Sequence, residues 1–222
     1  MKCRHCGWPL ELQFLDLGVA PPPNAYLTAE RVQAAELWLP LRLMVCQSCW
    51  LVQTLDYARS DTLFTENYAY FSSFSSSWLN HSRAYATEMI ARFGLDTNSA
   101  VCEVAANDGY LLQYFKVDGI PCYGVEPTAS TAKAARAKGI EIVEAFFGRE
   151  LARDLVEQGR SADLTAANNV LAHVPDINDF VGGFAVLLSR AASRPSNFLI
   201  CWKWRETISS IPHITSTIPI SP

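Results

Sequence analysis

Apolar and polar positions change in regular blocks along the second half of the chain, and each block has the length of one strand or one helix. Short apolar runs predict strands, and the segments between them carry apolar residues at the spacing of helices. Strands that alternate with helices in this way indicate a parallel sheet covered on both faces, an α/β fold. The expected strands are 100–105, 122–125, 140–143 and 162–167, and the expected helices are 109–116, 129–138, 149–158 and 176–188.

The first hundred residues follow a different pattern. Pro21 to Pro23 fix an extended connector, and the strand-like run WLPLRLMVC ends at Cys46. The next stretch, FTENYAYFSSFSSSW, contains tyrosines at a density that is unusual for a plain linker. Residues 78–93 have apolar positions at helical spacing and predict an amphipathic helix.

Four of the seven cysteines form two CxxC pairs, Cys3 with Cys6 and Cys46 with Cys49. Each pair can present two thiolates to one ion, and two pairs complete a tetrahedral site. Zinc is the expected metal because it favours a closed set of soft thiolate ligands. The alternatives are a redox pair or free thiols, but a redox CxxC normally begins a helix of a thioredoxin-like unit, and the sequence has no such pattern.

Composition and charge limit the partners and the cellular compartment that we expect for the protein. The chain of 222 residues has a net charge of −4 and no basic patch, so nucleic acid is not an expected partner. No apolar run reaches the roughly 18 residues of a membrane span. The N-terminal residues MKCRHC lack the apolar core of a signal peptide. We therefore expect a cytoplasmic protein with reduced thiols and no membrane partner.

An acidic residue ends each of the first two predicted strands, Glu103 and Glu126. A carboxylate after the second strand can bind a ribose diol, either of a nicotinamide dinucleotide or of S-adenosylmethionine. A dinucleotide requires a GxGxxG turn, whereas this chain has Ala105, Asn107 and Gly109. Glu103 would repel a pyrophosphate but suits a cationic ligand, so the local chemistry favours S-adenosylmethionine. We expect the turn to bring backbone N–H groups and a helix N-terminus to this ligand.

The strings CRHCG, CQSCW, EVAANDGYLLQYF, GVEP and ANNVLAHVPDINDFV, in this order, resemble the C-methyltransferases of deoxysugar biosynthesis. The resemblance extends from Met1 to about Leu188. These enzymes are class I S-adenosylmethionine-dependent methyltransferases with an N-terminal zinc module, and they act on nucleotide-linked keto sugars. The resemblance implies a Rossmann-like parallel sheet, incomplete in this chain, with S-adenosylmethionine and Zn²⁺ as cofactors and a nucleotide-linked sugar as substrate.

The same resemblance implies roles for individual residues. The methionine end of the cofactor would contact Glu103, Ala105, Asn107 and Gly109, and the ribose diol would bind Glu126. The adenine would lie against Ala145 and Phe146, and the sulfonium beside Asn168. Tyr68 and His173 would line the sugar pocket as catalytic residues, although a packed aromatic and a structural histidine are the plainer interpretations. The implied reaction is enolate alkylation: a base removes the proton beside the sugar ketone, and the enolate carbon attacks the methyl group on sulfur.

After Leu188 the resemblance stops. The family continues with a fifth strand and a tyrosine-histidine-glutamate-histidine cluster that carries the presumed base. Codons for 189–222 can be chosen so that the frame one base earlier encodes PRGVATVEFPHLLEMAGNN, which is similar to that continuation. We therefore expect a frameshifted, C-terminally truncated chain that binds its cofactors without transferring methyl groups. The apolar residues 198–202 could take the place of the fifth strand.

The expected organisation has four parts: a zinc-binding module at 1–60, a linker and helix lining the active site at 61–98, a partial S-adenosylmethionine-binding domain at 99–188, and an aberrant tail at 189–222. Three functions stay open. The first is a sugar C-methyltransferase, here truncated. The second is a non-catalytic zinc- and nucleoside-binding fragment, or one part of a split enzyme. The third is a methyltransferase for a different keto substrate.

Overall fold

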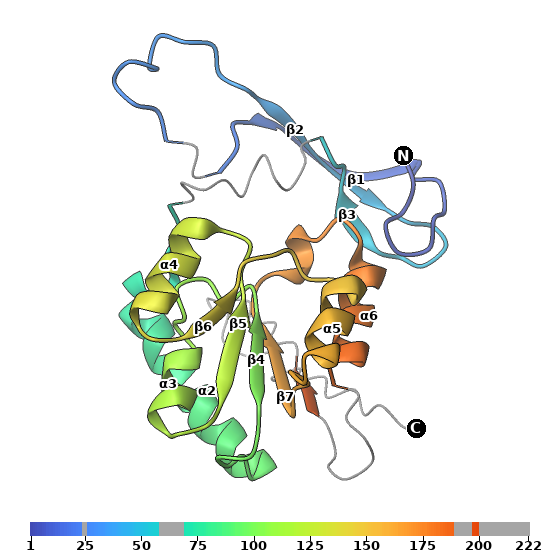
Figure 1. Cartoon of the computed structure of the whole chain (residues 1–222). Coiled ribbons are helices and arrows are strands. Elements are labelled where there is room, and N and C mark those ends of the chain that lie inside the picture. Colours follow the sequence, from blue (N-terminus) through green and yellow to red (C-terminus); the bar gives the residue numbers. More distant parts are fainter. Residues whose placement is uncertain (24–25, 58–68, 189–196, 200–222) are drawn as a thin grey trace.

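A computed structural model of the chain describes residues 1–23, 26–57, 69–188 and 197–199 (Figure 1). These residues contain two separate sheets. One has three strands in the order β1-β2-β3, and the other has five strands in the order β6-β5-β4-β7-β8. The smaller sheet comes from the N-terminal part of the chain and the larger one from the rest, and only the larger sheet is predicted by the sequence pattern.

The five-stranded sheet is parallel throughout. The chain starts in the middle of this sheet, at β4. It adds β5 and β6 on one side and then β7 and β8 on the other, so the direction of strand addition reverses beside β4. A reversal of this kind opens a crevice at the carboxyl ends of the neighbouring strands, where ligands bind. The strands are β4 Val101–Val104, β5 Cys122–Val125, β6 Glu141–Val143, β7 Leu164–Ala167 and β8 Asn197–Leu199.

Helices cover both faces of this sheet (Figure 1). One face packs against α2 (Ser76–Phe93), α3 (Leu112–Val117) and α4 (Ala129–Ala137), with Phe115 fully buried in that core. The other face packs against α5 (Arg149–Glu157) and α6 (Ile177–Leu187). The strands are sandwiched between two apolar layers, which explains why β4 and β7 are buried along their whole length.

The predicted α/β fold is confirmed, and its strands and helices are each within a few residues of the predicted positions. One helix differs in a way that matters for the site. We expected it to begin near Gly109, but α3 begins at Leu112 and has six residues. The preceding turn takes left-handed conformations at Ala105 (φ 57°), Asn107 (φ 50°) and Gly109 (φ 74°), which a helix cannot contain. The predicted helix therefore starts about three residues too early, and the contact of its N-terminus with a ligand stays a prediction.

The fifth strand is short. Asn197–Leu199 pairs with β7 in parallel, with Phe198 opposite Thr165. The expectation that apolar residues after Leu188 take the place of a fifth strand is confirmed at 198 and 199. Residues 200–202 lie outside the described part of the chain, as do 189–196 and the remainder of the tail.

The N-terminal sheet is antiparallel and consists of β1 Leu12–Ala20, β2 Leu39–Val45 and β3 Val52–Thr54. The strand-like run before Cys46 forms β2 as expected, while β1 and β3 are not predicted by the sequence pattern. Two short 3₁₀ helices, η1 Ser72–Phe74 and η2 Leu171–His173, lie in the connections. Among the described residues, no helix is both long and apolar enough to pass through a membrane.

Candidate functional site

The four predicted metal ligands converge at one end of the N-terminal sheet. All four Sγ atoms lie within 4.8 Å of one another. The Sγ atoms of Cys3 and Cys49 are 3.6 Å apart, and those of Cys6 and Cys46 are 3.5 Å apart. A tetrahedral zinc ion with Zn–S bonds of about 2.3 Å requires sulfur atoms about 3.8 Å apart, so this set of thiols fits zinc.

Each CxxC pair forms the same kind of turn. The Gly7 N–H donates to the Cys3 carbonyl at 2.9 Å, and the Trp50 N–H donates to the Cys46 carbonyl at 2.8 Å. Both closing residues are left-handed, Gly7 with φ 75° and Trp50 with φ 63°. The two turns are therefore equivalent, although only one of them has the glycine that this conformation favours.

The thiols cannot all ionise easily without a cation. Burial opposes ionisation of Cys3 and Cys46, but hydrogen bonds from neighbouring backbone N–H groups lower the pKa of both. Gln53 Nε2 also donates to Cys3 Sγ at 3.2 Å. At Cys49 the Leu51 N–H lowers the pKa, but desolvation and the other three thiols outweigh it and raise the pKa to about 12. A dication among four sulfurs removes this conflict, as expected for a zinc site.

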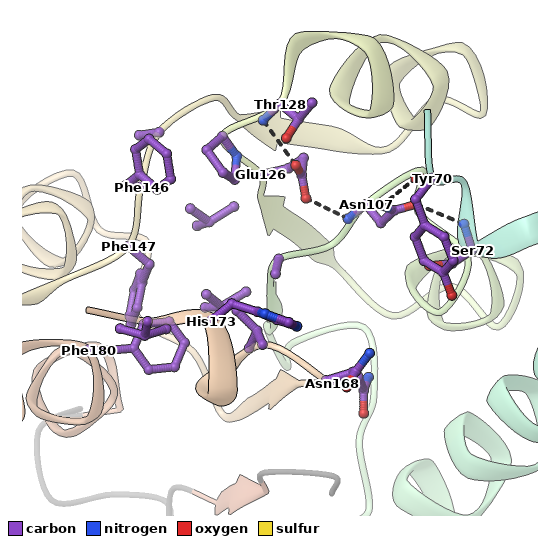
Figure 2. A pocket seen from close by; sticks show the side chains of 18 of the residues that line it. Tyr70, Ser72, Asn107, Glu126, Thr128, Phe146, Phe147, Asn168, His173 and Phe180 are labelled. Carbon is purple, nitrogen blue, oxygen red and sulfur yellow. Dashed lines mark hydrogen bonds between the residues drawn. The ribbon is translucent and has the colours of Figure 1, made fainter. Parts of the chain in front are cut away.

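A cavity of about 360 Å³ opens at the carboxyl ends of the parallel strands, at the reversal point beside β4 (Figure 2). Five segments form its walls: the turn after β4, the segments after β5 and β6, the long connection from β7 into α6, and the residues that lead into α2. Figure 2 shows Glu126 and Thr128 on one side, a group of phenylalanines on another, and Asn107 with Tyr70 on a third. The volume is in the range of small-molecule and cofactor sites.

Glu126 is held at the top of β5 by backbone donors. The Asn107 N–H donates to Oε2 at 2.9 Å, and the Thr128 N–H donates to Oε1 at 3.0 Å. The residue lines the cavity and is only 5% exposed. Each carboxylate oxygen has a second lone pair, so the group can still accept hydrogen bonds from a ligand diol.

The turn after β4 also holds the segment that precedes α2. Asn107 Nδ2 donates to the Tyr70 carbonyl at 3.1 Å, and the Ser72 N–H donates to Asn107 Oδ1 at 2.9 Å. Lys138 Nζ bonds both Ser73 Oγ and the Asp108 carbonyl at 2.7 Å. These contacts place Tyr70 and Ser72 at the edge of the cavity.

Glu103 lies behind the cavity wall and is completely buried. Its Oε1 accepts a hydrogen bond from Asn168 Nδ2 at 3.2 Å, while Oε2 has no hydrogen-bond partner among the described residues. Desolvation raises the pKa of Glu103 to about 8, against the opposing effect of Tyr110 and Asn168. A buried carboxylate with one unpaired oxygen suits a cationic group of a ligand at this end of the cavity.

The opposite end of the cavity is aromatic. Phe147 packs against Phe180 edge to face, with ring centroids 5.7 Å apart, and Phe146 remains 53% exposed. His173, in η2, points from the β7–α6 connection into the space between Glu126 and Asn168 (Figure 2). Desolvation by the surrounding protein lowers the pKa of His173.

The cavity brings together most of the residues that the sequence nominated. Seven of them line it: Ala105, Asn107, Glu126, Ala145, Phe146, Asn168 and His173. Glu103 lies one layer behind them. Gly109 does not line the cavity, because it packs beneath Ala135 and Ile140, where a Cβ atom would lie 2.4 Å from Ile140 Cδ1. Tyr68 lies outside the described residues.

The sequence analysis did not nominate several cavity-lining residues. These are Tyr70, Ser72, Trp78, Tyr110, Thr128, Phe147, Asp176, Asp179 and Phe180, with the apolar residues around them. Thr128 could have been found because it follows the acidic strand end at Glu126. The aspartates give no such signal, since Asp176 also reads as an ordinary helix N-cap, accepting from the N–H groups of Asn178 and Asp179.

The parallel sheet, its acidic strand ends and the four-cysteine module define a class I S-adenosylmethionine-dependent methyltransferase fold joined to a zinc-binding module. Residues 3–64 match a family described as "Putative zinc binding domain". The chain is similar to C-methyltransferase NovU of Streptomyces niveus, with 30% identity over 188 residues, which cover 85% of this chain. The zinc-binding match agrees with the four-cysteine cluster, and the similarity to a C-methyltransferase agrees with the fold and with S-adenosylmethionine as cofactor.

The chain spans 44% of the length of that relative. Solved structures of similar shape include magnesium protoporphyrin IX methyltransferase from Synechocystis, with a TM-score of 0.42 and 16% identity. That match covers 55% of this chain and 54% of the other. Another is a protein of Methanococcus maripaludis described as a "putative s-adenosyl-l-methionine-dependent methyltransferase", with a TM-score of 0.44, 14% identity and coverage of 58% of this chain and 59% of the other.

Proposed function

We propose that this chain binds S-adenosylmethionine in the cavity beside β4 and serves C-methylation of a nucleotide-linked keto-deoxysugar. NovU, the relative described above, is named as a C-methyltransferase. The sugar class rests on the resemblance of the sequence motifs. The geometry supports the first part of the proposal most directly, because it bears on how the cofactor would be held.

The observation that carries the proposal is the position of Glu126. Its carboxylate is fixed by two backbone N–H groups and faces a cavity that has aromatic rings at one end. A ribose diol bound to this carboxylate would place the adenine toward Phe146 and Phe147. The methionine end would then extend toward Asn168, with Glu103 behind it, whose buried carboxyl would lose its proton on pairing with the ammonium group.

The cofactor supplies an electrophilic methyl group when it is bound. The residues of this chain would orient the two reactants and handle the proton. His173 projects into the cavity, and its lowered pKa keeps the imidazole neutral near pH 7. A neutral imidazole can accept the proton from the carbon beside the sugar ketone, which creates the enolate. Tyr68 is proposed as its companion on the strength of the family resemblance.

The cofactor part is tested by calorimetric titration of the purified 222-residue, zinc-loaded chain with S-adenosylhomocysteine. Wild-type chain should bind it, and Glu126→Gln should weaken the affinity by about tenfold or more, since a charged group's hydrogen bonds to the ribose are lost. Glu144→Gln is the matched control. This nearby carboxylate is paired with Arg136 at 2.8 Å and does not line the cavity. No binding by the wild-type chain, or equal affinity in Glu126→Gln, would overturn the assignment.

A binding role without catalysis is the second candidate. The family motifs stop at about Leu188, whereas the fifth strand of the sheet, Asn197–Leu199, lies beyond them. The sheet is therefore completed by residues that do not resemble the family, which favours binding without catalysis. On this proposal the chain holds zinc and cofactor but does not complete methyl transfer. The test is incubation with methyl-labelled S-adenosylmethionine and nucleotide-linked keto sugars. A labelled methyl group attached to a sugar carbon would show that the chain is an active enzyme.

A further inference from the structure

Two residues of the zinc module, Arg4 and His5, contact the α/β domain. Both lie between the zinc ligands Cys3 and Cys6 in sequence, and the side chain of Arg4 is only 11% exposed. Its Nη1 donates to the Val174 carbonyl at 3.3 Å. His5 Nδ1 and Asn178 Oδ1 are 2.8 Å apart, and Asn178 Nδ2 donates to the His5 carbonyl at 2.7 Å. A single turn of the module thus makes three hydrogen bonds to residues that are 170 or more positions away in the sequence.

The contacted segment is one wall of the cavity. Val170, His173, Val174, Pro175, Asp176, Asp179 and Phe180 all line the cavity, and they belong to the connection from β7 and the first turn of α6. Val174 directly follows His173, and Asn178 lies between the two cavity-lining aspartates. The zinc module therefore contacts this wall at Val174, which lines the cavity, and at Asn178, which lies between lining residues (Figure 1).

The contacts are tied to the thiols through the backbone and through Gln53. The Arg4 N–H donates to Gln53 Oε1 at 3.0 Å, and the Nε2 of the same Gln53 donates to Cys3 Sγ at 3.2 Å. Arg4 Nη2 is held in turn by the Thr54 carbonyl at 2.9 Å and by Asp56 Oδ1 at 2.7 Å. A metal ion that fixes Cys3 and Cys6 also fixes the two residues between them. The module core is too small to do so by packing alone.

We infer that Arg4 and His5 are positioning residues for the cavity, so that zinc loading holds the wall bearing His173 and Asp176 in its ligand-binding arrangement. The zinc-binding turn acts through Val174 and Asn178 and touches no ligand itself. This inference rests on the proposed cofactor site for its functional consequence. Its structural consequence, the ordering of residues 170–180 by the zinc module, can be measured without any ligand.

The experiment is hydrogen exchange of the full chain, read on peptides that cover 170–180. The zinc-loaded wild type is compared with the chelated chain and with the double variant Arg4→Ala/His5→Ala, with bound zinc measured in each sample. We expect exchange at 170–180 to rise about tenfold in the chelated chain and in the double variant, which should retain its zinc. Peptides of β4 and β5 should not change. The S-adenosylhomocysteine affinity of the double variant should fall by about three- to tenfold.

The matched control is Gln47→Ala/Ser48→Ala, which alters the two exposed residues between Cys46 and Cys49 in the equivalent turn. It should change neither the exchange at 170–180 nor the affinity. The conservative variant Arg4→Lys/His5→Asn keeps one donor at each place and should restore part of the protection. A general loss of stability would not be rescued in this way.

Unchanged exchange at 170–180 in the zinc-loaded double variant would overturn the inference, and so would equal effects of the two double variants. Failure of the wild type to bind S-adenosylhomocysteine would overturn the proposed function instead. The exchange comparison would still decide whether the zinc module orders the wall.

Discussion

The two sheets of this protein are stabilised in different ways. Every residue of β4 is at most 2% exposed, whereas β1 has eight of nine residues exposed, including Phe14 at 66% and Leu17 at 59%. Burial of apolar area stabilises the parallel sheet, which is covered by helices on both faces. Among the described residues up to 57, only four side chains are buried: Met44 and Gln53 in the sheet, and the zinc ligands Cys3 and Cys46.

This difference indicates that metal binding replaces a hydrophobic core in the module. Small units without a sufficient core depend on metals or disulfides for their folding free energy. The α/β domain has two buried apolar clusters of its own. The hydrogen bonds from Arg4 and His5 nevertheless link the two regions at the cavity wall.

The largest expected effect comes from removing one ligand. Cys46→Ser should abolish stoichiometric zinc binding and unfold the module, because structural zinc contributes on the order of 10 kcal/mol in small domains. Zinc content and hydrogen exchange of β1 and β2 are the measurements. The α/β domain should keep its exchange protection in β4 and β7. Cys122→Ser, at a cysteine outside the cluster, should retain zinc, and loss of zinc there would contradict the assignment.

A smaller effect should appear in the α/β domain as a pH dependence. The pKa of Glu103 is raised to about 8 in the folded chain, against about 4.3 in an unfolded one. Between these values the folded chain retains a proton that the unfolded chain has lost, so the free energy of unfolding falls as the pH rises. Stability from the neutral carboxyl is complete below about pH 4.3 and is lost progressively up to about pH 8.

Glu103→Gln removes this dependence. Its free energy of unfolding should exceed that of the wild type by a margin that grows by on the order of 2 kcal/mol between pH 6 and pH 8. Urea unfolding of the zinc-loaded chains at several pH values measures the margin. Glu144→Gln, at an exposed carboxylate, should follow the wild-type curve. Parallel curves for wild type and Glu103→Gln would show that the buried carboxyl does not titrate in this range.

The smallest effect should come from the backbone of the second zinc turn. Trp50 adopts φ 63° with 69% of its surface exposed, so little packing compensates for a left-handed conformation. Trp50→Gly should stabilise the loaded module by about 1 kcal/mol, which is roughly fivefold in zinc affinity. Competition with a chelator measures this. Gly7→Ala, where a Cβ atom meets nothing within 4 Å, should shift the affinity the other way through φ alone.

The sequence by itself determined the order of strands and helices in the α/β domain, the four cysteine ligands and the acidic ends of β4 and β5. Hydrophobic periodicity predicts these elements because each depends on neighbouring positions, and CxxC spacing is likewise local. The sequence also predicts that Glu126 lies at the ligand-binding edge of the sheet, since it follows a parallel strand and the carboxyl ends of such strands form that edge. His173 entered through family resemblance, and its side chain does project into the cavity.

Only the tertiary structure decided the rest. It showed that Ala105 and Asn107 take the left-handed conformations that glycines hold in a GxGxxG turn, and that Gly109 serves packing against α4 rather than the ligand. It also joined His5 to Asn178, which lie 173 positions apart. Contacts of this separation leave no periodic trace in the chain. They depend on how two independently stabilised sheets dock, which the folding of the whole chain determines.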